Sequence, residues 1–309
     1  MPNLTYIIIV TYNGIPWIKR CLDSCNEYNV IVIDNASHDE TTTFIETNYP
    51  DVIQLKQDKN LGFGQANNLG IIHALNNGAE YVFLLNQDAY LQKNTLKILI
   101  ETNQNNPKFG ILSPIHLNGE GKRLDKNFSN YVAYRNNPDF YSDFILEKSL
   151  SNVYEVPFVN AAGWLLTRGI LESVGGFDPI FFHYGEDDNY CQRAIYHGFK
   201  IGVVPTAFML HDREDRLVTH IEHGSSQYLD KLEKSVKIKF GNINLENDAE
   251  LDALIVKRTK SKNRAYIKLE FTKVTFLKKE IALLKSLKNQ IYSSKKQGKI
   301  SGTNYLSDF

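Results

Sequence analysis

Short apolar runs separated by helical patterns are the feature of this sequence that most restricts its fold. Three runs, at residues 6–10, 30–33 and 81–85, are continuous rather than alternating, and a weaker one lies at residues 52–55. The patterns between them include a predicted helix at residues 67–75. Continuous apolar strands that alternate with helices are typical of a mostly parallel sheet covered on both faces. The sequence therefore predicts an α/β fold of this kind.

Four polar stretches follow the predicted strands, at residues 11–13, 34–37, 58–67 and 86–88. Ligands of parallel sheets bind beyond the carboxyl ends of the strands, so these stretches are the candidate binding positions. Asp34 directly follows the second strand, where its carboxylate can accept a hydrogen bond from a nucleobase N–H or from ribose hydroxyls. The alternative is a turn or helix-capping role, which aspartate often fills.

Asn86, Gln87 and Asp88 follow the fourth strand. A single aspartate at such an edge can hold Mg²⁺ or Mn²⁺, because these cations prefer oxygen ligands and share them with substrate phosphates. Asn86 could add a carbonyl oxygen or reach a ribose hydroxyl. A polar turn is the alternative, and it suits Gln87 well.

Glu186, Asp187 and Asp188 form the densest acidic cluster at a predicted helix start. Neighbouring like charges raise one another's pKa, which is one route to a general base. Helix N-termini also favour acids through capping and the macrodipole, so a structural role stays open. His211 follows a strand-like run, where a neutral imidazole could be a metal ligand.

The end of the chain is strongly basic although the formal net charge of all 309 residues is zero. Residues 256–300 contain 14 Lys/Arg and 2 Asp/Glu, a net charge of +12, which leaves −12 on the remainder. We place a domain boundary near Asp215, which gives an α/β domain at residues 1–215 and a basic helical extension at residues 216–309. Within the first domain, residues 116–155 lack periodicity and predict a loop or a small antiparallel excursion.

Apolar residues of the extension recur at helical spacing. They are Phe271, Phe276, Leu277, Ile281, Leu284, Leu287 and Ile291. A basic helix of this kind can lie on a membrane surface and bring an enzyme to lipid-linked acceptors. The alternatives are packing on the first domain and dimerisation with a second copy. Nucleic-acid binding is not expected, because no basic motif is interleaved with aromatic residues.

Cysteine usage and hydropathy bear on the compartment. The three cysteines are an odd, sparse set that does not suit a disulfide framework, which indicates a reducing environment. The N-terminal run lacks the features of a signal peptide, and no segment approaches the roughly 18 apolar residues of a membrane span. These features predict a cytoplasmic protein, with peripheral attachment to the inner face of the membrane as an option.

Several segments taken together resemble family-2 glycosyltransferases of the GT-A fold, closest in pattern to rhamnosyltransferase-like enzymes of bacterial surface-polysaccharide assembly. The resemblance covers residues 4–215 and rests on the order and separation of its segments. These are residues 9–13, 32–37, 60–64, 67–70, 84–88, 175–178 and 184–187, followed by Cys191 and Arg193. It implies inverting transfer of a sugar from a UDP-, dTDP- or GDP-sugar donor to a hydroxyl of a glycan or lipid-linked acceptor.

The resemblance also implies roles for single residues. The nucleotide-sugar would contact Thr11, Asn13, Asp34, Asp58, Asn67, Asn86 and Gln87. Asp88 resembles the last aspartate of the family's D-x-D motif, which binds Mg²⁺ or Mn²⁺ at the donor diphosphate. His211 resembles a histidine that completes metal coordination in many members, and Asp187 resembles the base of the E-D motif.

On the acceptor side, Trp164, with Asn160 before it, would form a platform, or Trp164 would belong to the core. Two departures from the family pattern affect these assignments. Asn86 stands where the D-x-D motif begins. Asn189 takes the last place of the pattern E-D-x-D found in many relatives, which leaves either Asp187 or Asp188 as the base; we favour Asp187.

Two other functions are compatible with parts of the sequence. One is a non-catalytic nucleotide- or glycan-binding subunit of a polysaccharide assembly complex. The other is a nucleotidyltransferase, which should carry a glycine-rich, basic phosphate loop near the N-terminus. Residues 11–16 contain neither lysine nor arginine, which disfavours the second.

Overall fold

The computed structural model describes residues 4–213 and 221–306, which divide into two compact units. The first unit contains residues 4–213 together with residues 301–306, and the second contains residues 221–300. The described part of the second unit consists of helices and their connections. None of the described helices is both long enough and apolar enough to span a bilayer.

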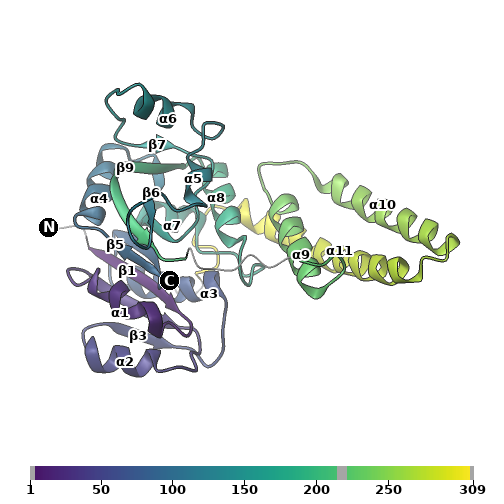
Figure 1. Cartoon of the computed structure of the whole chain (residues 1–309), viewed down its shortest axis with the longest axis horizontal. Coiled ribbons are helices and arrows are strands. Elements are labelled where there is room, and N and C mark those ends of the chain that lie inside the picture. Colours follow the sequence, from purple (N-terminus) through teal and green to yellow (C-terminus); the bar gives the residue numbers. More distant parts are fainter. Residues whose placement is uncertain (1–3, 214–220, 307–309) are drawn as a thin grey trace. The chain divides into compact units, whose positions relative to one another are not determined.

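A nine-stranded mixed sheet forms the centre of the first unit (Figure 1). Its strands are β1 (Thr5–Thr11), β2 (Asn29–Asp34), β3 (Ile53–Lys56), β4 (Tyr81–Asn86), β5 (Ala89–Leu91), β6 (Phe109–Asn118), β7 (Tyr154–Glu155), β8 (Gly163–Thr167) and β9 (Lys200–His211). The order across the sheet is β3-β2-β1-β4-β8-β6-β9-β5, and β7 pairs with β9. The apolar runs of the sequence therefore form β1 to β4, as predicted.

The sheet is less parallel than the sequence suggested. β3, β2, β1 and β4 run parallel, as do β6 and β9. β8 runs antiparallel to both β4 and β6, while β5 and β7 run antiparallel to β9. Because β8 reverses between β4 and β6, the carboxyl ends of β1, β2, β3, β4, β6 and β9 all lie at one edge. We call this the carboxyl edge.

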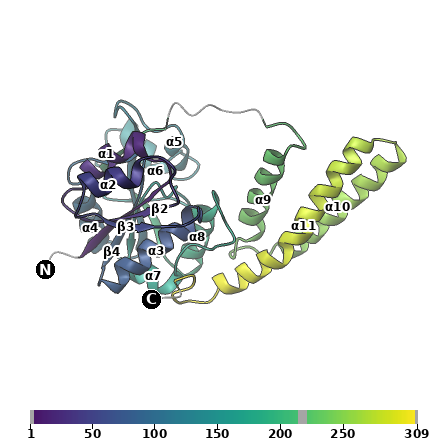
Figure 2. The same cartoon turned by 90° about the horizontal axis from the view of Figure 1, so that it is seen from below.

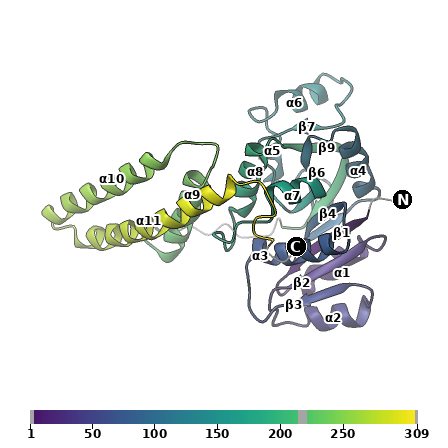
Figure 3. The same ribbon diagram turned by 180° about the vertical axis from the view of Figure 1, so that it is seen from behind.

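Helices cover both faces of the sheet (Figures 1 and 3). On one face α3 (Phe63–Asn76), α7 (Arg168–Val174) and α8 (Glu186–Tyr196) share a buried cluster with Ile8 of β1. On the other, α1 (Ile15–Asp23), α2 (Thr41–Asn48) and α4 (Thr95–Asn105) share a cluster with Ile7 and Ile9. Successive strand residues point to opposite faces, so the continuous apolar run of β1 serves both cores.

Helix α3 begins four residues earlier than predicted and packs closely on the sheet. Gly62, with a φ of 80°, precedes its first residue. A Cβ atom at Gly70 would lie 2.6 Å from Ile8 Cγ2 and 2.8 Å from Ile33 Cδ1. This glycine therefore allows the close approach of helix and sheet.

The weakly patterned stretch at residues 116–155 contains the end of β6, α5 (Phe128–Tyr131), α6 (Pro138–Ile145) and β7. Its antiparallel parts are the isolated bridge between Leu117 and Leu124 and β7, where Tyr154 lies opposite Val203 of β9. The stretch is therefore more helical than the predicted loop or antiparallel excursion.

The second unit consists of α9 (Ser226–Phe240), α10 (Asp248–Ile267) and α11 (Phe271–Gly298), with α11 packed along both other helices (Figure 2). One buried carboxylate links all three. Glu280 of α11 lies 3.3 Å from Arg258 Nε of α10 and accepts a 3.4 Å hydrogen bond from the Tyr228 hydroxyl of α9.

The apolar stripe predicted on α11 is mostly buried. Its buried members are Leu277, Ile281, Leu284, Leu287 and Ile291. Phe276 is half-buried, and Phe271, the first residue of α11, is exposed. The prediction that this stripe as a whole lies on a membrane is wrong, because most of its apolar surface is already removed from water.

Residues 301–306 belong to the first unit rather than to a continuous extension at residues 216–309. Gly176 N donates a 2.8 Å hydrogen bond to Asn304 O, and Gly302 N donates a 2.9 Å bond to Ser173 O. The Tyr305 hydroxyl donates to Asp178 at 3.1 Å, and Leu306 is buried. The end of the described chain therefore stabilises the segment before α8.

Candidate active site

Asp34 lies at the carboxyl edge in a network that joins two loops. It is 3% exposed, and its carboxylate accepts a 3.1 Å hydrogen bond from the Thr11 hydroxyl. Ser37 donates to the same carboxylate from its backbone N–H at 2.9 Å and from its hydroxyl at 2.5 Å. Asn13 N donates to Ser37 Oγ at 2.9 Å. Asp34 therefore has the turn role that was the alternative to ligand binding. Nucleotide binding by Thr11, Asn13 and Asp34 stays a prediction.

Two other residues predicted to bind the donor are Asp58, in the loop after β3, and Asn67, within α3. Asp58 is exposed in the loop that follows β3. Asn67 is 1% exposed, and its side chain donates a 3.0 Å hydrogen bond to Phe63 O within α3. Asn35, which sequence reasoning missed, holds the same loop by donating to Gly62 O at 3.1 Å and accepting from Leu61 N at 2.9 Å.

Asn86 and Gln87 follow β4 at the same edge. Asn86 is half-buried and its N–H donates to Ala162 O at 3.0 Å. The Gln87 side chain accepts from Tyr12 N at 3.0 Å and donates to Tyr12 O at 3.3 Å. A Cβ atom at Gly14 would lie 2.6 Å from Gln87 Oε1. Gln87 therefore fastens the loop after β1 to the loop after β4.

Asp88 and His211 come together because β5 pairs with β9. Ala89 lies opposite His211 in this ladder, and Asp212 N donates a 2.8 Å hydrogen bond to Asp88 O. Asp88 Oδ1 lies 3.5 Å from His211 Nε2, and both side chains are almost fully buried. Neither ring nitrogen of His211 has a hydrogen-bond partner among the described residues.

A buried imidazole without hydrogen bonds loses the solvation of its nitrogens, so the arrangement calls for a further partner. A divalent cation fits, because carboxylate oxygen and imidazole nitrogen are both common ligands. No group of three or more His, Cys, Asp or Glu residues suited to a metal occurs in the described part of the chain. The protein itself would therefore supply two ligands, and substrate phosphates or water would supply the others.

A second buried histidine backs the first. The rings of His116 and His211 lie 5.9 Å apart in an edge-on arrangement, and His116 Nε2 is 3.0 Å from Ser113 Oγ. Burial, and then the neighbouring His211, lower the pKa of His116 well below its ordinary value. His116 is therefore neutral at physiological pH and adds no positive charge beside the cation ligands.

Arg213 and Asp125 form a bidentate ion pair beside this site, with nitrogen–oxygen distances of 2.6 and 2.8 Å. Burial acts to raise the pKa of Asp125, but the hydrogen bonds and charge of Arg213 and the N–H of Phe128 bring it down to about 2. The pKa of Arg213 is raised by Asp125, Tyr131 and Asp88, against the opposing effect of burial. Asp88 is therefore close enough to this pair to interact with it.

Tyr131 connects the pair to the acids of α8. Burial raises its pKa to about 12; Arg213 opposes the shift, and the charges of Asp187 and Asp125 add to it. Asp88 thus interacts with Arg213 and Asp187 interacts with Tyr131, although the two aspartates are 99 positions apart in the sequence. Sequence reasoning missed Asp125, Tyr131 and Arg213, because two of them lie in the weakly patterned stretch.

The three acids of α8 occupy its first turn after Gly185, which has a φ of 99°. Glu186 is buried, whereas Asp187 and Asp188 are half-buried. The start of α8 lies against the start of α3, since a Cβ atom at Gly64 would lie 3.5 Å from Glu186 Cβ. This contact places the acids at the carboxyl edge.

Asn189, the departure from the acidic pattern, has a structural partner. It is 1% exposed and its Oδ1 accepts a 2.9 Å hydrogen bond from Arg193 Nε. Arg193, also buried, donates to Val174 O at 2.8 Å and to Gly176 O at 2.6 Å. The last place of the motif therefore supports the turn before α8 instead of facing a ligand.

The acceptor platform predicted at Trp164 is wrong. Trp164 is 0% exposed and stacks on Phe177, with ring centroids 6.2 Å apart and an interplanar angle of 15°. Tyr190 packs 5.8 Å away. Because core packing encloses the indole, it offers no face to a ligand. Asn160 is half-buried, its Oδ1 has no hydrogen-bond partner among the described residues, and its acceptor role stays a prediction.

Comparison with curated proteins finds relatives that share about a quarter of their residues with this chain. The dTDP-rhamnosyl transferase RfbF of Shigella flexneri is 25% identical over 230 residues, which is 71% of this chain and 72% of that protein. The N-acetylglucosaminyl-diphospho-decaprenol L-rhamnosyltransferase of Mycobacterium tuberculosis is 25% identical over 244 residues, 69% of this chain and 77% of that protein.

Comparison with solved structures supports the fold. The structure of GalNAc-T7 with UDP, GalNAc and Mn²⁺ aligns with a TM-score of 0.55 and 18% identity. The alignment covers 77% of this chain and 48% of GalNAc-T7, so the chain spans about half the length of that protein. The central sheet flanked by helices is therefore the GT-A fold. Residues 6–175, more than half of the chain, match the glycosyl transferase family 2, and the protein belongs to that family.

Proposed function

We propose that this protein is an inverting glycosyltransferase that moves a deoxyhexose, rhamnose in the first instance, from a dTDP-sugar to a hydroxyl of a glycan or lipid-linked acceptor. The setting would be the assembly of a surface polysaccharide. Two relatives named as rhamnosyltransferases support the sugar, and the printed name of one supports the base. The observation that carries the proposal is the buried Asp88–His211 pair on the same edge as Asp187. The imidazole nitrogens of His211 have no hydrogen-bond partner among the residues that the structure describes.

The donor would lie along the carboxyl edge. Asp34 would accept a hydrogen bond from the base or ribose, with Thr11 and Ser37 fixing the orientation of its carboxylate. Asn86 would reach the ribose or diphosphate from the end of β4. These positions suit a nucleotide because the parallel strands β1, β2 and β4 all end there.

Asp88 and His211 would hold Mg²⁺ or Mn²⁺ at the diphosphate. The GalNAc-T7 structure, solved with Mn²⁺ and UDP, supports a cation in this fold. When bound, such a cation stabilises the negative charge that develops on the departing nucleoside diphosphate. Asp125 would keep Arg213 in place, so that its positive charge adds to the field around the diphosphate.

Asp187 would act as the general base. As the acceptor oxygen forms its bond to C1 of the sugar, its proton passes to the Asp187 carboxylate. The C1–O bond to the diphosphate breaks, the electron pair leaves with the nucleotide, and the configuration at C1 inverts. The N-terminal position of Asp187 in α8 favours the ionised carboxylate, which is the form that a base requires.

The test is the turnover of dTDP-rhamnose and related donors by Asp187→Asn and Asp88→Ala, with Asp188→Asn as the matched control. Loss of a placed base lowers kcat by about 10²- to 10⁴-fold, whereas the control should keep kcat within a few-fold of wild type. Calorimetry should show that Asp187→Asn still binds dTDP in the presence of Mn²⁺.

Two results would overturn this assignment. One is wild-type turnover by both active-site variants on the true acceptor. The other is tight, metal-independent dTDP binding without transfer of any donor, which would make the protein a binding subunit of an assembly complex.

A further inference from the structure

Four large apolar side chains project into solvent where α10 turns into α11. Their exposed fractions are 63% for Tyr266, 80% for Ile267, 69% for Leu269 and 60% for Phe271. We call residues 266–271 the hairpin tip. Isolated exposed apolar residues are ordinary, but four within six positions form a patch of the kind that marks an interaction site.

The tip presents these side chains in an ordered but strained turn. Glu270 N donates to Ala265 O at 3.0 Å and Leu269 N donates to Tyr266 O at 3.0 Å. This pattern closes the C-terminal end of α10, and Leu269, two residues beyond the helix, has a φ of 57°. Glycine usually occupies such a position, because the left-handed conformation costs other residues about 1–2 kcal/mol. Leucine here is therefore unfavourable for both backbone conformation and solvation.

Positive charge is concentrated around the tip. Residues 256–279 contain nine Lys/Arg and one Asp/Glu, a net charge of +8. The other described residues of the unit, 221–255 and 280–300, contain nine Lys/Arg and eight Asp/Glu, a net charge of +1. The basic character of the extension therefore belongs to one end of the helical hairpin.

Two basic residues near the tip have an acidic partner, since Arg258 lies 3.3 Å from Glu280 and Lys273 lies 2.9 Å from Glu270, but several others do not. Lys288 pairs with Asp252 and Lys295 pairs with Asp248, away from the tip. Lys257, Lys260 and Lys268 are exposed and form no ion pair with the described residues. Exposed like charges repel one another, so their concentration favours an anionic partner.

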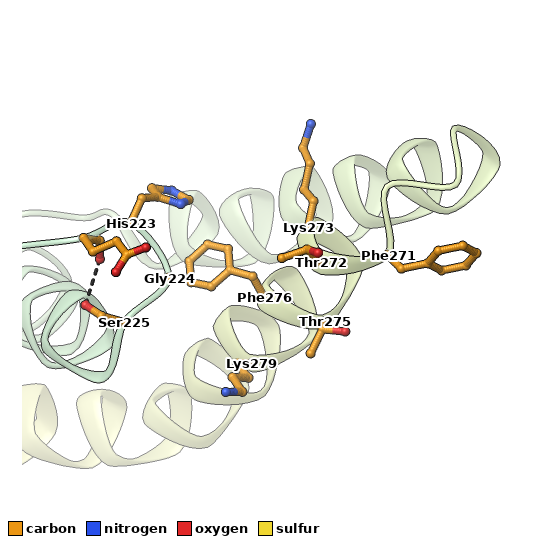
Figure 4. Close-up of a pocket in the computed structure, with 10 residues that line it drawn as sticks. His223, Gly224, Ser225, Phe271, Thr272, Lys273, Thr275, Phe276 and Lys279 are labelled. Carbon is orange, nitrogen blue, oxygen red and sulfur yellow. Dashed lines mark hydrogen bonds between the residues drawn. The ribbon is translucent and has the colours of Figure 1, made fainter.

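A groove of about 920 Å³ lies next to the first turns of α11 (Figure 4). Phe276 lines it together with Lys273 and Lys279, and His223 faces it from the segment before α9. Figure 4 shows Phe271 directed away from Phe276 and His223. Phe271 lines the outer end of the same groove and remains exposed, with basic side chains following it along α11.

We propose that the hairpin tip docks on an anionic phospholipid bilayer. Ile267, Leu269 and Phe271 enter the boundary between head groups and acyl chains, and Tyr266 lies at the level of the head groups, as amphipathic rings do. The surrounding lysines contact lipid phosphates, and each basic residue near an anionic surface strengthens binding about fivefold.

Charge and chemistry favour this partner over two others. A second copy docking through the same tip would bring two +8 segments together, and these would repel. Nucleic acid is anionic and would attract the basic segment, but it offers no apolar environment for isoleucine and leucine side chains. Proteins that bind single strands stack aromatic rings on the bases instead. A bilayer surface accommodates both the charge and the apolar side chains.

The experiment measures partition of the full chain onto vesicles of phosphatidylcholine alone and of phosphatidylcholine mixed with phosphatidylglycerol. The tip variant is Ile267→Ser/Leu269→Asn/Phe271→Ser. Asparagine tolerates the left-handed conformation at position 269, so the variant should keep its melting temperature. Leu245→Asn, an exposed leucine between α9 and α10 that is 48% exposed, is the matched control.

We expect binding that depends on phosphatidylglycerol and weakens with salt, at least a tenfold loss in the tip variant, and no change in the control. A Lys257→Gln/Lys260→Gln variant should bind anionic vesicles about 25-fold more weakly, since two charges at about fivefold each are removed. Lys231→Gln, on α9, should be close to wild type.

Three results would overturn the proposal: equal partition of wild type and tip variant, a concentration-dependent dimer that the tip variant abolishes, or binding to DNA that exceeds binding to anionic vesicles. The proposal does not depend on the sugar-transfer proposal. Vesicle binding by a protein without transferase activity would contradict only the latter, and transfer to a soluble acceptor by a tip variant would leave it intact.

Discussion

Charged side chains are concentrated at the carboxyl edge of the sheet and around the hairpin tip, but they are buried at the edge and exposed around the tip. At the edge, Asp88, Asp125 and His211 are almost fully buried and each interacts with another polar group. Near the tip, Lys257 and Lys260 are exposed and form no ion pair with the described residues. Buried charges must be paired or they destabilise the fold, whereas exposed charges cost little. The edge is therefore suited to hold a small ligand in one geometry, and the tip to meet an extended anionic surface.

The largest expected effect on stability comes from a buried cation that supports the edge. Arg193→Met would leave Val174 O and Gly176 O without their hydrogen bonds. Since an unsatisfied buried acceptor costs about 1–3 kcal/mol, we expect the free energy of unfolding to fall by about 3 kcal/mol. Denaturant unfolding of Arg193→Met beside Lys257→Met, the removal of an exposed cation on α10, measures the difference. If the two variants had equal free energies of unfolding, the buried Arg193 would contribute no more to stability than an exposed lysine.

His211→Ala tests the edge as a cation site. In the proposed site this side chain would be one of two protein ligands. We expect its loss to lower the apparent affinity for Mn²⁺ in the transfer reaction by at least about 10- to 100-fold, the loss typical for removal of a partner of a metal ligand. Titration of the reaction with Mn²⁺ at fixed donor gives this value. Ser113→Ala, which removes a partner of the neighbouring His116, serves as the control and should change it only slightly. An unchanged Mn²⁺ requirement in His211→Ala would show that the histidine is not a ligand.

The ion pair of Asp125 and Arg213 should make stability depend on acid pH. The pKa of Asp125 is lowered from the ordinary 3.8 to about 2, so the folded state favours the carboxylate. Its contribution is complete above about pH 4 and is lost as the pH falls through 2, and it amounts to about 2 kcal/mol. The melting temperature, measured between about pH 2 and pH 5, should change less with pH in Asp125→Asn than in wild type. If the melting temperatures of the two proteins changed equally with pH, the ion pair would not be the source of the acid dependence.

The smallest effect is expected for the exposed lysines of α10 that precede the tip. Lys257→Gln and Lys260→Gln should change the free energy of unfolding by no more than about 0.5 kcal/mol, because substitutions of exposed residues without partners rarely exceed this. Urea unfolding is the measurement. A loss above about 1 kcal/mol would mean that these lysines contribute to the packing of α10 and α11.

How far the sequence predicts the site depends on the distance over which each residue acts. The positions of Asp34 and Asp88 were predictable because Asp34 is the last residue of β2 and Asp88 lies two residues beyond β4, and strand ends can be predicted from local patterns. The Arg213–Asp125 pair was not, because it joins positions 88 residues apart and one of them lies in an irregular stretch. The role of Trp164 was not predictable either, because the sequence around a tryptophan does not show whether it lies in the core or in a binding site. Its neighbours in the tertiary structure decide this.

The sequence by itself determined the strands β1 to β4, the polar residues at their carboxyl ends and the concentration of basic residues near the end of the chain. Only the tertiary structure decided that β8 turns the sheet mixed, that β5 brings Asp88 against His211, and that the apolar stripe of α11 is mostly buried while the hairpin tip is exposed. The physical reason is that strand and helix formation depend on the periodicity of nearby side chains, whereas burial and pairing depend on which distant segments pack together.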